Sequence, residues 1–392
     1  MPRRWVTVFN RNRDDYQVPL ALVEAGLLDC HVADFYAPRP APWWLPRRLA
    51  RMAHPGLARE RTRWSVSSFL MQMAGIALRL PMDRVFPLSD FLLGLTAARV
   101  ARARGANLLC YGSYVPPRAL MRREAKLVVF EFHPHPALTY ALLERDARAF
   151  PQVRASFAAE RRDRDRAGVT GAWRKADRII CASSMTRRSL VHAGCEESRI
   201  AVVPYGFTAP GGPMAERPAG TCQFLFVGQG IQRKGLHHLL LAWNALAGLD
   251  AELTLVCYRI DPGIAAMAAQ AGVRVLAHQS PADLARLYGE SDVFVMPSIV
   301  EGFGLVYLEA LAAGCHVVGT QNTGLPDLPL DERAVSIVAV GAVDELAARL
   351  VELVARKQAG GLRPAEIAAQ ANNWQWADFR AGVAAELARL ED

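Results

Sequence analysis

The chain has 392 residues, more than a single hydrophobic core usually serves, so we expect two domains. Hydrophobic residues make up 52% of it and charged residues 21%, which excludes a disordered protein, and no run of 18 apolar residues offers a membrane-spanning helix. The net charge of +8 is uneven: residues 1–205 carry +15 and residues 206–392 carry −7, so only the first half is expected to be drawn to an anionic surface.

The cysteines and the N-terminus indicate the compartment. Seven cysteines are scattered without a C-x-x-C pair, which is typical of reduced thiols and not of a disulfide framework. The chain enters a strand-like segment at once, with no apolar stretch of signal-peptide length before it. We therefore expect a cytoplasmic protein.

Strand-like segments alternate with helical stretches along the whole chain. In the first half the strand-like segments are WVTVFN, HVADFY, ANLLCYG, KLVVFEF, RIICAS and IAVVPY. In the second half they are CQFLFVG, AELTLVCY, VRVLAH, SDVFVMPS and CHVVGT. Such alternation predicts parallel sheets covered by helices on both faces. We expect two doubly wound, Rossmann-like α/β domains facing across a cleft.

The predicted boundary is a linker dense in proline and glycine, residues 204–221. It separates a first domain of residues 1–205 from a second of residues 206–373. Residues 374–392 form a last helix, expected to pack back toward the first domain. Ligands of open parallel sheets bind beyond the carboxyl ends of the strands, so a site is expected between the two domains.

Residues 36–64 interleave three tryptophans with seven arginines. Indole rings at the headgroup level and arginines on anionic lipid are what a peripheral membrane contact requires. A solvated basic face with tryptophans packed inward explains the segment equally well. No nucleic-acid-binding module surrounds it, so nucleic acid is not an expected partner.

The segment KLVVFEFHPHP places Glu131, His133 and His135 at the end of a predicted strand. A His-x-His pair in extended chain points both rings to one face, which is how zinc ligands are presented, although no third ligand besides Glu131 is evident. A purely structural role for the histidines is the other interpretation.

The segment FLFVGQGIQRKGLHHLLLAW, residues 224–243, reads as a strand, a glycine-bearing loop and a helix. Gly228 and Gly230 allow a tight turn, and Arg233 and Lys234 lie where the helix begins. A helix N-terminus with adjacent cations favours an anion such as a diphosphate. An ordinary strand-to-helix turn with solvated cations is equally compatible.

The segment PSIVEGFGLVYLEALAAG, residues 297–314, carries Glu301 and Glu309 among apolar residues. A helix starting near Gly304 leaves Glu301 in the loop and Glu309 in the helix. Eight helical residues span about 12 Å and about 80° of rotation, which excludes the close carboxylate pair of retaining glycosidases. Two carboxylates so placed instead suit the hydroxyl groups of one elongated ligand, with the backbone donors of Phe303, Gly304 and Leu305 between them.

These motifs resemble the donor-binding half of retaining, nucleotide-sugar-dependent glycosyltransferases of family 4, which have the two-domain GT-B fold. The resemblance is strong over residues 223–328, moderate over residues 175–207 and weak before that. It rests on VGQGIQRKG followed by the E-x7-E pattern in its setting of P-S, E-G-F-G, E-A and A-x-G. The Gly-Gly loop that usually follows the first strand of this family is absent here.

The resemblance implies a role for each candidate residue. Glu309 would bind the ribose hydroxyls of the nucleotide, and Glu301 would lie at the donor sugar. Lys234 matches the lysine that contacts the diphosphate, whereas Gln229 stands where an arginine is usual, so Arg233 is expected to supply that charge. His278 and Gln279 fall in the base-proximal loop. His133 would approach the donor sugar from the first domain, and we favour this role over a metal site.

The sequence therefore predicts a retaining glycosyltransferase without an essential metal or cofactor. The donor is an NDP-sugar, with UDP favoured and GDP next. The acceptor is a saccharide or a lipid-linked saccharide at the inner membrane face, in surface polysaccharide or glycolipid assembly. An NDP-sugar epimerase of the same fold and a non-catalytic nucleotide-sugar-binding subunit of a synthase remain alternatives.

Overall fold

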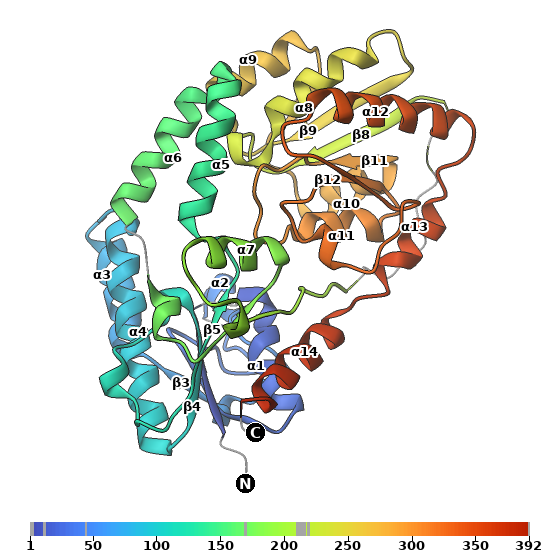
Figure 1. Ribbon diagram of the computed structural model, residues 1–392. Coiled ribbons are helices and arrows are strands. Elements are labelled where there is room, and N and C mark those ends of the chain that lie inside the picture. The colour runs from blue at the N-terminus through green and yellow to red at the C-terminus, as the bar shows by residue number, and fades with distance from the viewer. Residues whose placement is uncertain are drawn as a thin grey trace.

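The computed structural model describes residues 4–10, 13–43, 45–167, 171–208, 217 and 220–390. Two parallel β-sheets lie in separate lobes, each covered by helices on both faces (Figure 1). The first sheet has the strand order β3-β2-β1-β4-β5-β6-β7, and the second has the order β10-β9-β8-β11-β12-β13. Every strand pair in both sheets is parallel, which confirms the predicted fold class.

The strands are short and mostly buried, which is why they appear in the sequence as apolar runs rather than as alternating patterns. Those of the first sheet are β1 (Trp5–Val8), β2 (Leu28–Ala33), β3 (Thr62–Trp64), β4 (Asn107–Tyr111), β5 (Leu127–Glu131), β6 (Arg178–Cys181) and β7 (Ile200–Val202). Those of the second are β8 (Cys222–Val227), β9 (Ala251–Val256), β10 (Arg274–Leu276), β11 (Val293–Val295), β12 (His316–Thr320) and β13 (Val335–Val338).

Most helices lie between successive strands, as the crossovers of parallel sheets require, and α12, α13 and α14 follow the last strand. Helices that follow strands of the first sheet are α1 (Gln17–Glu24), α2 (Arg47–Ala50), α3 (Val66–Ala77), α4 (Met82–Arg104), α5 (Pro136–Ala149), α6 (Arg154–Ala167) and α7 (Ser184–His192). Those that follow strands of the second are α8 (Leu236–Trp243), α9 (Pro262–Gln270), α10 (Pro281–Glu290), α11 (Leu305–Ala312), α12 (Val343–Gln358), α13 (Pro364–Ala371) and α14 (Trp376–Ala388).

The edge strands β3 and β13 were not anticipated from the sequence. β3 contains Arg63 and Trp64, both exposed, so it lacks the apolar run that marks the inner strands. β13 alternates between buried and more exposed positions, because successive side chains point to opposite faces and only one face is well covered, so it too lacks a continuous apolar run. Most of the predicted linker, residues 209–216 and 218–219, lies outside the described residues.

The last helix, α14, crosses from the second lobe and lies against α1 of the first (Figure 1). Arg380 Nε donates to Glu24 Oε2 at 2.7 Å, and Arg178 Nη2 donates to Glu386 Oε2 at 2.7 Å. The ring of Phe379 is fully buried and lies 6.0 Å from that of Phe130 on β5. The C-terminal helix is therefore part of the packing of the first lobe.

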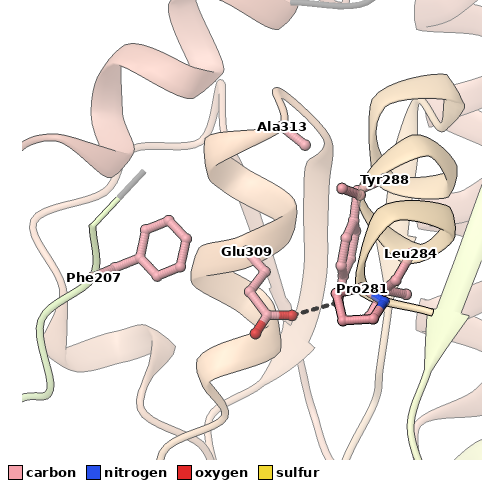
Figure 2. A pocket seen from close by; sticks show the side chains of 7 residues that line it. Phe207, Pro281, Leu284, Tyr288, Glu309 and Ala313 are labelled. Atoms are coloured by element: carbon pink, nitrogen blue, oxygen red, sulfur yellow. Dashed lines mark hydrogen bonds between the residues drawn. The ribbon is translucent and has the colours of Figure 1, made fainter. Parts of the chain in front are cut away.

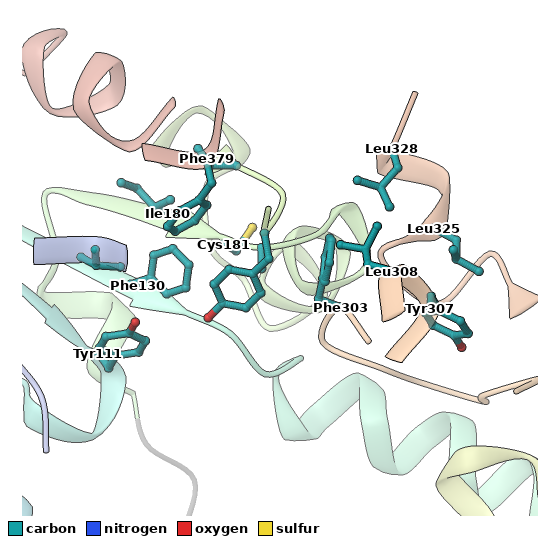
Figure 3. Packing of buried hydrophobic residues seen from close by; sticks show 14 of the residues in the cluster. Tyr111, Phe130, Ile180, Cys181, Phe303, Tyr307, Leu308, Leu325, Leu328 and Phe379 are labelled. Atoms are coloured by element: carbon teal, nitrogen blue, oxygen red, sulfur yellow. The ribbon is translucent and has the colours of Figure 1, made fainter. Parts of the chain in front are cut away.

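Buried apolar residues form one cluster that continues from one lobe to the other. Figure 3 shows this continuity, from Tyr111 and Phe130 in the first lobe to Phe303 and Tyr307 in the second. Tyr205 contacts Phe303 edge to face, with ring centroids 5.6 Å apart. The two lobes are thus packed together next to the loop that carries Glu301.

Candidate functional site

The reversal of strand order in the second sheet determines where its site lies. β8 and β11 are neighbours although the strands β9 and β10 lie between them in the chain, so the strand order reverses here and the loops that follow β8 and β11 border one crevice. The loop after β8 carries Arg233 and Lys234, and the loop after β11 carries Glu301. Residues 68 positions apart therefore meet at one crevice.

Glu301 is the centre of this crevice. Its Oε2 accepts from Lys234 Nζ and lies 3.3 Å from Arg233 Nη1, and its Oε1 accepts from the amide of Gly302 at 3.1 Å. Burial raises the pKa of this carboxyl, but the charges of Lys234 and Arg233 outweigh burial and lower its pKa to about 2. Glu301 is therefore ionised at neutral pH, with two cations held beside it.

Two glycines allow this close packing. Gly235 adopts φ +68°, and a Cβ there would overlap with the carbonyl oxygen of Pro297, so only glycine fits between the two loops. Gly302 faces the first domain, where a Cβ would overlap with the carbonyl oxygen of Phe132. Neither role was predicted from the sequence, because the partners of Gly235 and Gly302, the carbonyls of Pro297 and Phe132, lie far from them along the chain.

The predicted loop glycines have smaller roles in packing. A Cβ at Gly230 would lie 2.5 Å from Ile260 Cγ1, because residues 230 and 260 pair as an isolated bridge. At Gly228 the nearest atom would be at an ordinary 3.6 Å. Gln229, the residue in the place of the family's arginine, donates to the hydroxyl of Tyr258.

Helix α11 starts as predicted. Gly304 is its N-cap residue at φ +94°, and the helix runs from Leu305, so Glu301 lies in the loop and Glu309 in the helix. The free amides of the first turn, beside Phe303, point out of the helix start and favour negative charge. Tyr307 of this turn donates its hydroxyl proton to the carbonyl of Met296 at 2.8 Å, which fixes the helix on the end of β11.

Glu309 lines a pocket between α10 and α11 (Figure 2). The pocket has a volume of about 240 Å³ and is bordered by Phe207 from the segment that joins the domains, by Leu284 and Tyr288 of α10, and by Ala313. Tyr288 donates its hydroxyl proton to Glu309 Oε2 at 3.0 Å. Burial raises the pKa of Glu309, and this hydrogen bond partly opposes the rise. One carboxylate oxygen is thus engaged by Tyr288.

The structure brings His133 to the site but not His278. His133 is exposed, its loop lies against Gly302, and its charge contributes to the low pKa of Glu301. His135 instead caps α5, because its Nδ1 accepts from the amide of Ala137 at 3.2 Å. His278 is exposed in the loop before α10 and does not line the pocket of Glu309.

The carboxyl edge of the first sheet contains further polar groups: Glu131, predicted above only as a candidate metal ligand, and the loop residues Asp14, Asp15 and Tyr16, for which no role was predicted. Burial raises the pKa of Glu131, at the end of β5, to about 7. In the loop after β1, three consecutive residues, Asp14, Asp15 and Tyr16, have φ between +46° and +60°, a conformation that is costly for residues other than glycine. Asp14 Oδ2 accepts from the hydroxyls of Tyr111 at 2.8 Å and Tyr205 at 2.7 Å.

A second contact between the lobes involves a buried carboxylate on α5. Asp146 accepts from Gln232 Nε2 at 2.8 Å, and its oxygens lie 3.0 Å from His237 Nε2 and 2.7 Å from His238 Nε2. Within the described part of the chain, Asp146, His237 and His238 form the one cluster with metal-ligand spacing, and Glu131, His133 and His135 do not form another. Hydrogen bonds already satisfy both oxygens of Asp146.

The predicted membrane segment, residues 36–64, is only partly described, because Trp44 lies outside the described residues. Trp43 is 95% exposed, whereas Trp64 is 40% exposed and its ring lies 4.6 Å from that of the buried Phe35, so the inward packing of the alternative interpretation is found in part for Trp64 and not for Trp43. Trp64 Nε1 donates to the carbonyl of Tyr36 at 3.1 Å. No helix in the described ranges is both long and apolar enough to span a bilayer.

Comparison with known proteins links the second domain to one family. Residues 221–356 match the family described as Glycosyl transferases group 1. The D-inositol 3-phosphate glycosyltransferase of Mycobacteroides abscessus is 34% identical over 140 residues, 36% of this chain and 30% of that protein. The enzyme of the same name from Arthrobacter sp. is 31% identical over 225 residues, 51% of this chain and 53% of that protein. The chain thus spans about half or less of these curated relatives.

Solved structures match over nearly the whole chain. Sucrose-phosphate synthase from Thermosynechococcus elongatus superposes with a TM-score of 0.61 at 16% identity, covering 99% of this chain and 98% of that chain. The lipopolysaccharide outer core galactosyltransferase WaaB has a TM-score of 0.59 at 13% identity, covering 97% and 99%. Alr3699/HepE of Anabaena, solved with UDP and glucose, has a TM-score of 0.56 at 15% identity, covering 98% and 99%. The fold is GT-B.

Proposed function

We propose that this chain, whose residues 221–356 form a glycosyl transferases group 1 domain, is a retaining glycosyltransferase that uses an NDP-sugar donor. The observation that carries the proposal is the meeting of Glu301 with Lys234 and Arg233 at the crevice of the second sheet, against the His133 loop of the first domain. A sugar diphosphate satisfies both kinds of group, because its phosphates suit the cations and its hydroxyls suit the carboxylate.

The nucleotide is proposed to lie along α11. Its ribose hydroxyls would donate to Glu309, whose second oxygen is not the one that Tyr288 engages, and the adjoining pocket between α10 and α11 has room for an apolar ring face. His278 and Gln279, in the loop that leads into α10, are proposed to meet the base outside this pocket, which neither residue lines. UDP is the favoured nucleotide, and GDP is the next. UDP is also the nucleotide bound in the solved structure of Alr3699/HepE from Anabaena.

Catalysis is proposed to depend on position and charge. The acceptor hydroxyl attacks the anomeric carbon on the face from which the diphosphate departs, the bond from that carbon to the phosphate oxygen breaks, and the hydroxyl proton passes to the departing diphosphate. Lys234, Arg233 and the amides at the start of α11 would stabilise the charge on that group, so no metal is required for this purpose. Glu301, already ionised, positions the sugar and cannot serve as a proton donor.

The acceptor is proposed to bind the first domain beside His133. The crevice of the first sheet offers Glu131 and the strained loop Asp14–Tyr16, and strain of this kind is concentrated at functional sites. A saccharide or lipid-linked saccharide is the proposed acceptor for these polar groups, in surface polysaccharide or glycolipid assembly. The positive charge of residues 1–205 agrees with an acceptor that carries phosphate.

The proposal is tested in two steps. Calorimetry with UDP, GDP, ADP and dTDP identifies the nucleotide, and the corresponding NDP-sugars are then incubated with and without candidate acceptors. We expect tight binding of one nucleotide, acceptor-dependent release of the NDP, and a product with the anomeric configuration of the donor. Release of NDP and free sugar without any acceptor dependence would instead indicate an epimerase. Binding without turnover on every NDP-sugar would indicate a non-catalytic subunit.

A further inference from the structure

The exposed apolar side chains of the protein are concentrated in one part of the first domain. Among the described residues, sixteen large hydrophobic side chains are exposed, and ten of them lie within residues 43–91. Scattered exposed apolar residues are ordinary on protein surfaces, but a local concentration marks an interaction surface. This part of the chain contains the helical hairpin of α3 and α4, which lies at the outer flank of the first lobe (Figure 1).

Helix α3 has its polar side chains on the inside. Ser68 and Gln72 are buried against α4, where Ser68 Oγ lies 2.9 Å from Ser89 Oγ and Gln72 Nε2 donates to Ser89 Oγ at 2.8 Å. Gln72 also donates to Asp34 Oδ2 at 3.2 Å. Gly75 completes this face and lets Val85 of α4 approach. The polar groups of α3 are thus satisfied within the protein.

The apolar side chains of α3 face outward. Val66, Leu70, Met73 and Ile76 recur at helical spacing and are 59%, 59%, 38% and 58% exposed. A surface helix of a soluble protein normally has the reverse arrangement, with its apolar stripe toward the core. The stripe continues past the helix end, where the exposed aliphatic side chains are Leu78 at 69% and Leu80 at 47%.

We propose that the outward face of α3, with the turn that follows it, docks on an anionic lipid bilayer. The segment that carries this apolar surface is basic, since residues 39–91 contain nine arginines and three carboxylates, a net charge of +6, and the exposed Arg63 and Arg79 flank α3 in the chain. Arg79 and Arg84 are exposed at the tip of the hairpin, and the nearly fully exposed Trp43 lies in the same part of the chain. Aliphatic side chains for the acyl boundary, an indole for the headgroup level and arginines for lipid phosphates match an interfacial surface.

The position of this surface connects it with the proposed acceptor. α3 begins directly after the carboxyl end of β3, and Gln72 reaches Asp34, which follows the carboxyl end of β2. The carboxyl edge of this sheet borders the cleft between the domains. A protein docked through α3 would hold that edge near the bilayer, which suits a lipid-linked acceptor; this last step rests on the proposed function, whereas the docking itself does not.

The test compares vesicle binding of three proteins by co-sedimentation with phosphatidylglycerol–phosphatidylcholine vesicles and with phosphatidylcholine vesicles, at 50 mM and 500 mM NaCl. The first is the full-length chain, and the second is Leu70→Glu with Ile76→Glu, which places two carboxylates on the outward face. The third is the matched control Leu249→Glu with Val351→Glu, two exposed apolar positions of the second domain. Thermal melting of all three shows whether the fold is kept, as expected for exposed positions.

We expect the full-length chain and the control to bind the anionic vesicles at low salt, more weakly at high salt. We expect the Leu70→Glu, Ile76→Glu protein to lose at least tenfold in vesicle affinity at an unchanged melting temperature. Absence of wild-type binding at low salt, or equal binding by the double variant, would overturn the proposal. A wild-type dimer in light scattering that the double variant abolishes, without vesicle binding, would assign the face to a second copy instead. Vesicle binding needs neither donor nor acceptor, so it stands or fails independently of glycosyl transfer.

Discussion

At the scale of single residues, the two glutamates of residues 301–309 differ in their surroundings. Glu301 is paired with two cations that lower its pKa to about 2, whereas burial raises the pKa of Glu309, which accepts a hydrogen bond from the neutral hydroxyl of Tyr288. Glu301 therefore forms ion pairs with Lys234 and Arg233, the two cations that would contact a diphosphate. Glu309 is available for hydroxyl groups and lies away from the cations.

We therefore expect different defects from replacing each glutamate. Glu309→Ala removes the proposed ribose acceptor, and because hydrogen bonds to a charged group are worth about 1.5–3 kcal/mol, NDP binding should weaken about 10- to 100-fold in calorimetry. Glu301→Ala should reduce kcat more than it changes the Kd of the NDP. Glu352→Ala, on the exposed face of α12, is the control. Unchanged activity in both Glu301 and Glu309 variants would contradict the assignment of the site.

Gly302 offers a test of the contact between the domains. A methyl group there would overlap with the carbonyl oxygen of Phe132, so Gly302→Ala should keep the Glu301 loop away from the His133 loop. We expect kcat to fall at least tenfold while the Kd of the NDP, which is bound by the second domain, changes less than twofold. Gly171→Ala is the control, because its methyl group would meet only ordinary contacts at 3.6 Å. Full activity of Gly302→Ala would show that turnover does not require this approach.

At the scale of elements, α14 joins the end of the chain to the first domain. Phe379 is fully buried among the rings of Phe130, Tyr205 and Trp376. Large-to-small substitution of a buried phenylalanine costs about 3–5 kcal/mol through lost burial and the cavity left behind. The packing of α14 therefore contributes to the stability of the first domain.

We expect Phe379→Ala to lower the free energy of unfolding by about 3–5 kcal/mol in urea, monitored by tryptophan fluorescence. Arg389→Ala, at a position whose side chain is 69% exposed, should change it by less than about 0.5 kcal/mol. A loss below about 1 kcal/mol for Phe379→Ala would mean that α14 is not integral to the first domain.

At the scale of the whole molecule, buried histidines couple stability to pH. Burial lowers the pKa of His31 to about 3. Burial is also the main reason that the pKa of His316 is lowered to about 4 and that the pKa of His237 is lowered. As the pH falls below about 6.5, the unfolded chain binds protons at these histidines and the folded chain does not. Each of these histidines therefore lowers the free energy of unfolding as the pH falls. Glu131 has the opposite effect on the free energy of unfolding. Because its pKa is raised to about 7 in the folded chain, the folded chain binds a proton there at a higher pH than the unfolded chain does.

The histidine contribution is therefore measured as a difference. We expect the free energy of unfolding of the wild type, relative to His31→Gln, to fall by about 2 kcal/mol between pH 7.5 and pH 5, since the unfolded pKa of about 6.5 leaves about 1.5 pH units of linkage. Urea unfolding of the wild type and of His31→Gln, each at pH 7.5 and at pH 5, gives the four free energies of unfolding that are compared. An equal change for both proteins would show that His31 does not stay neutral in the folded chain.

Several elements follow from local sequence alone. The buried strands β1, β4, β5, β6, β8, β9 and β12 appear as apolar runs because both faces of a parallel sheet are covered, and Gly304 marks the start of α11. The edge strand β3 could not be found in this way, because two of its three residues, Arg63 and Trp64, are exposed. The outward orientation of the apolar side chains of α3 was also not predicted. The spacing of apolar residues along a helix is the same whether they face the core or the solvent.

The sequence by itself determined the fold class of two doubly wound domains and predicted Lys234, Glu301 and Glu309 as site residues, because periodicity and motif spacing are local properties of the chain. Only the tertiary structure decided which of these residues meet. The neighbouring positions of β8 and β11 bring Glu301 to Lys234, and the contact at Gly302 brings it to the loop of His133, while His278 stays apart. Strand order and domain contacts are long-range properties, set by the packing of segments that are distant along the chain.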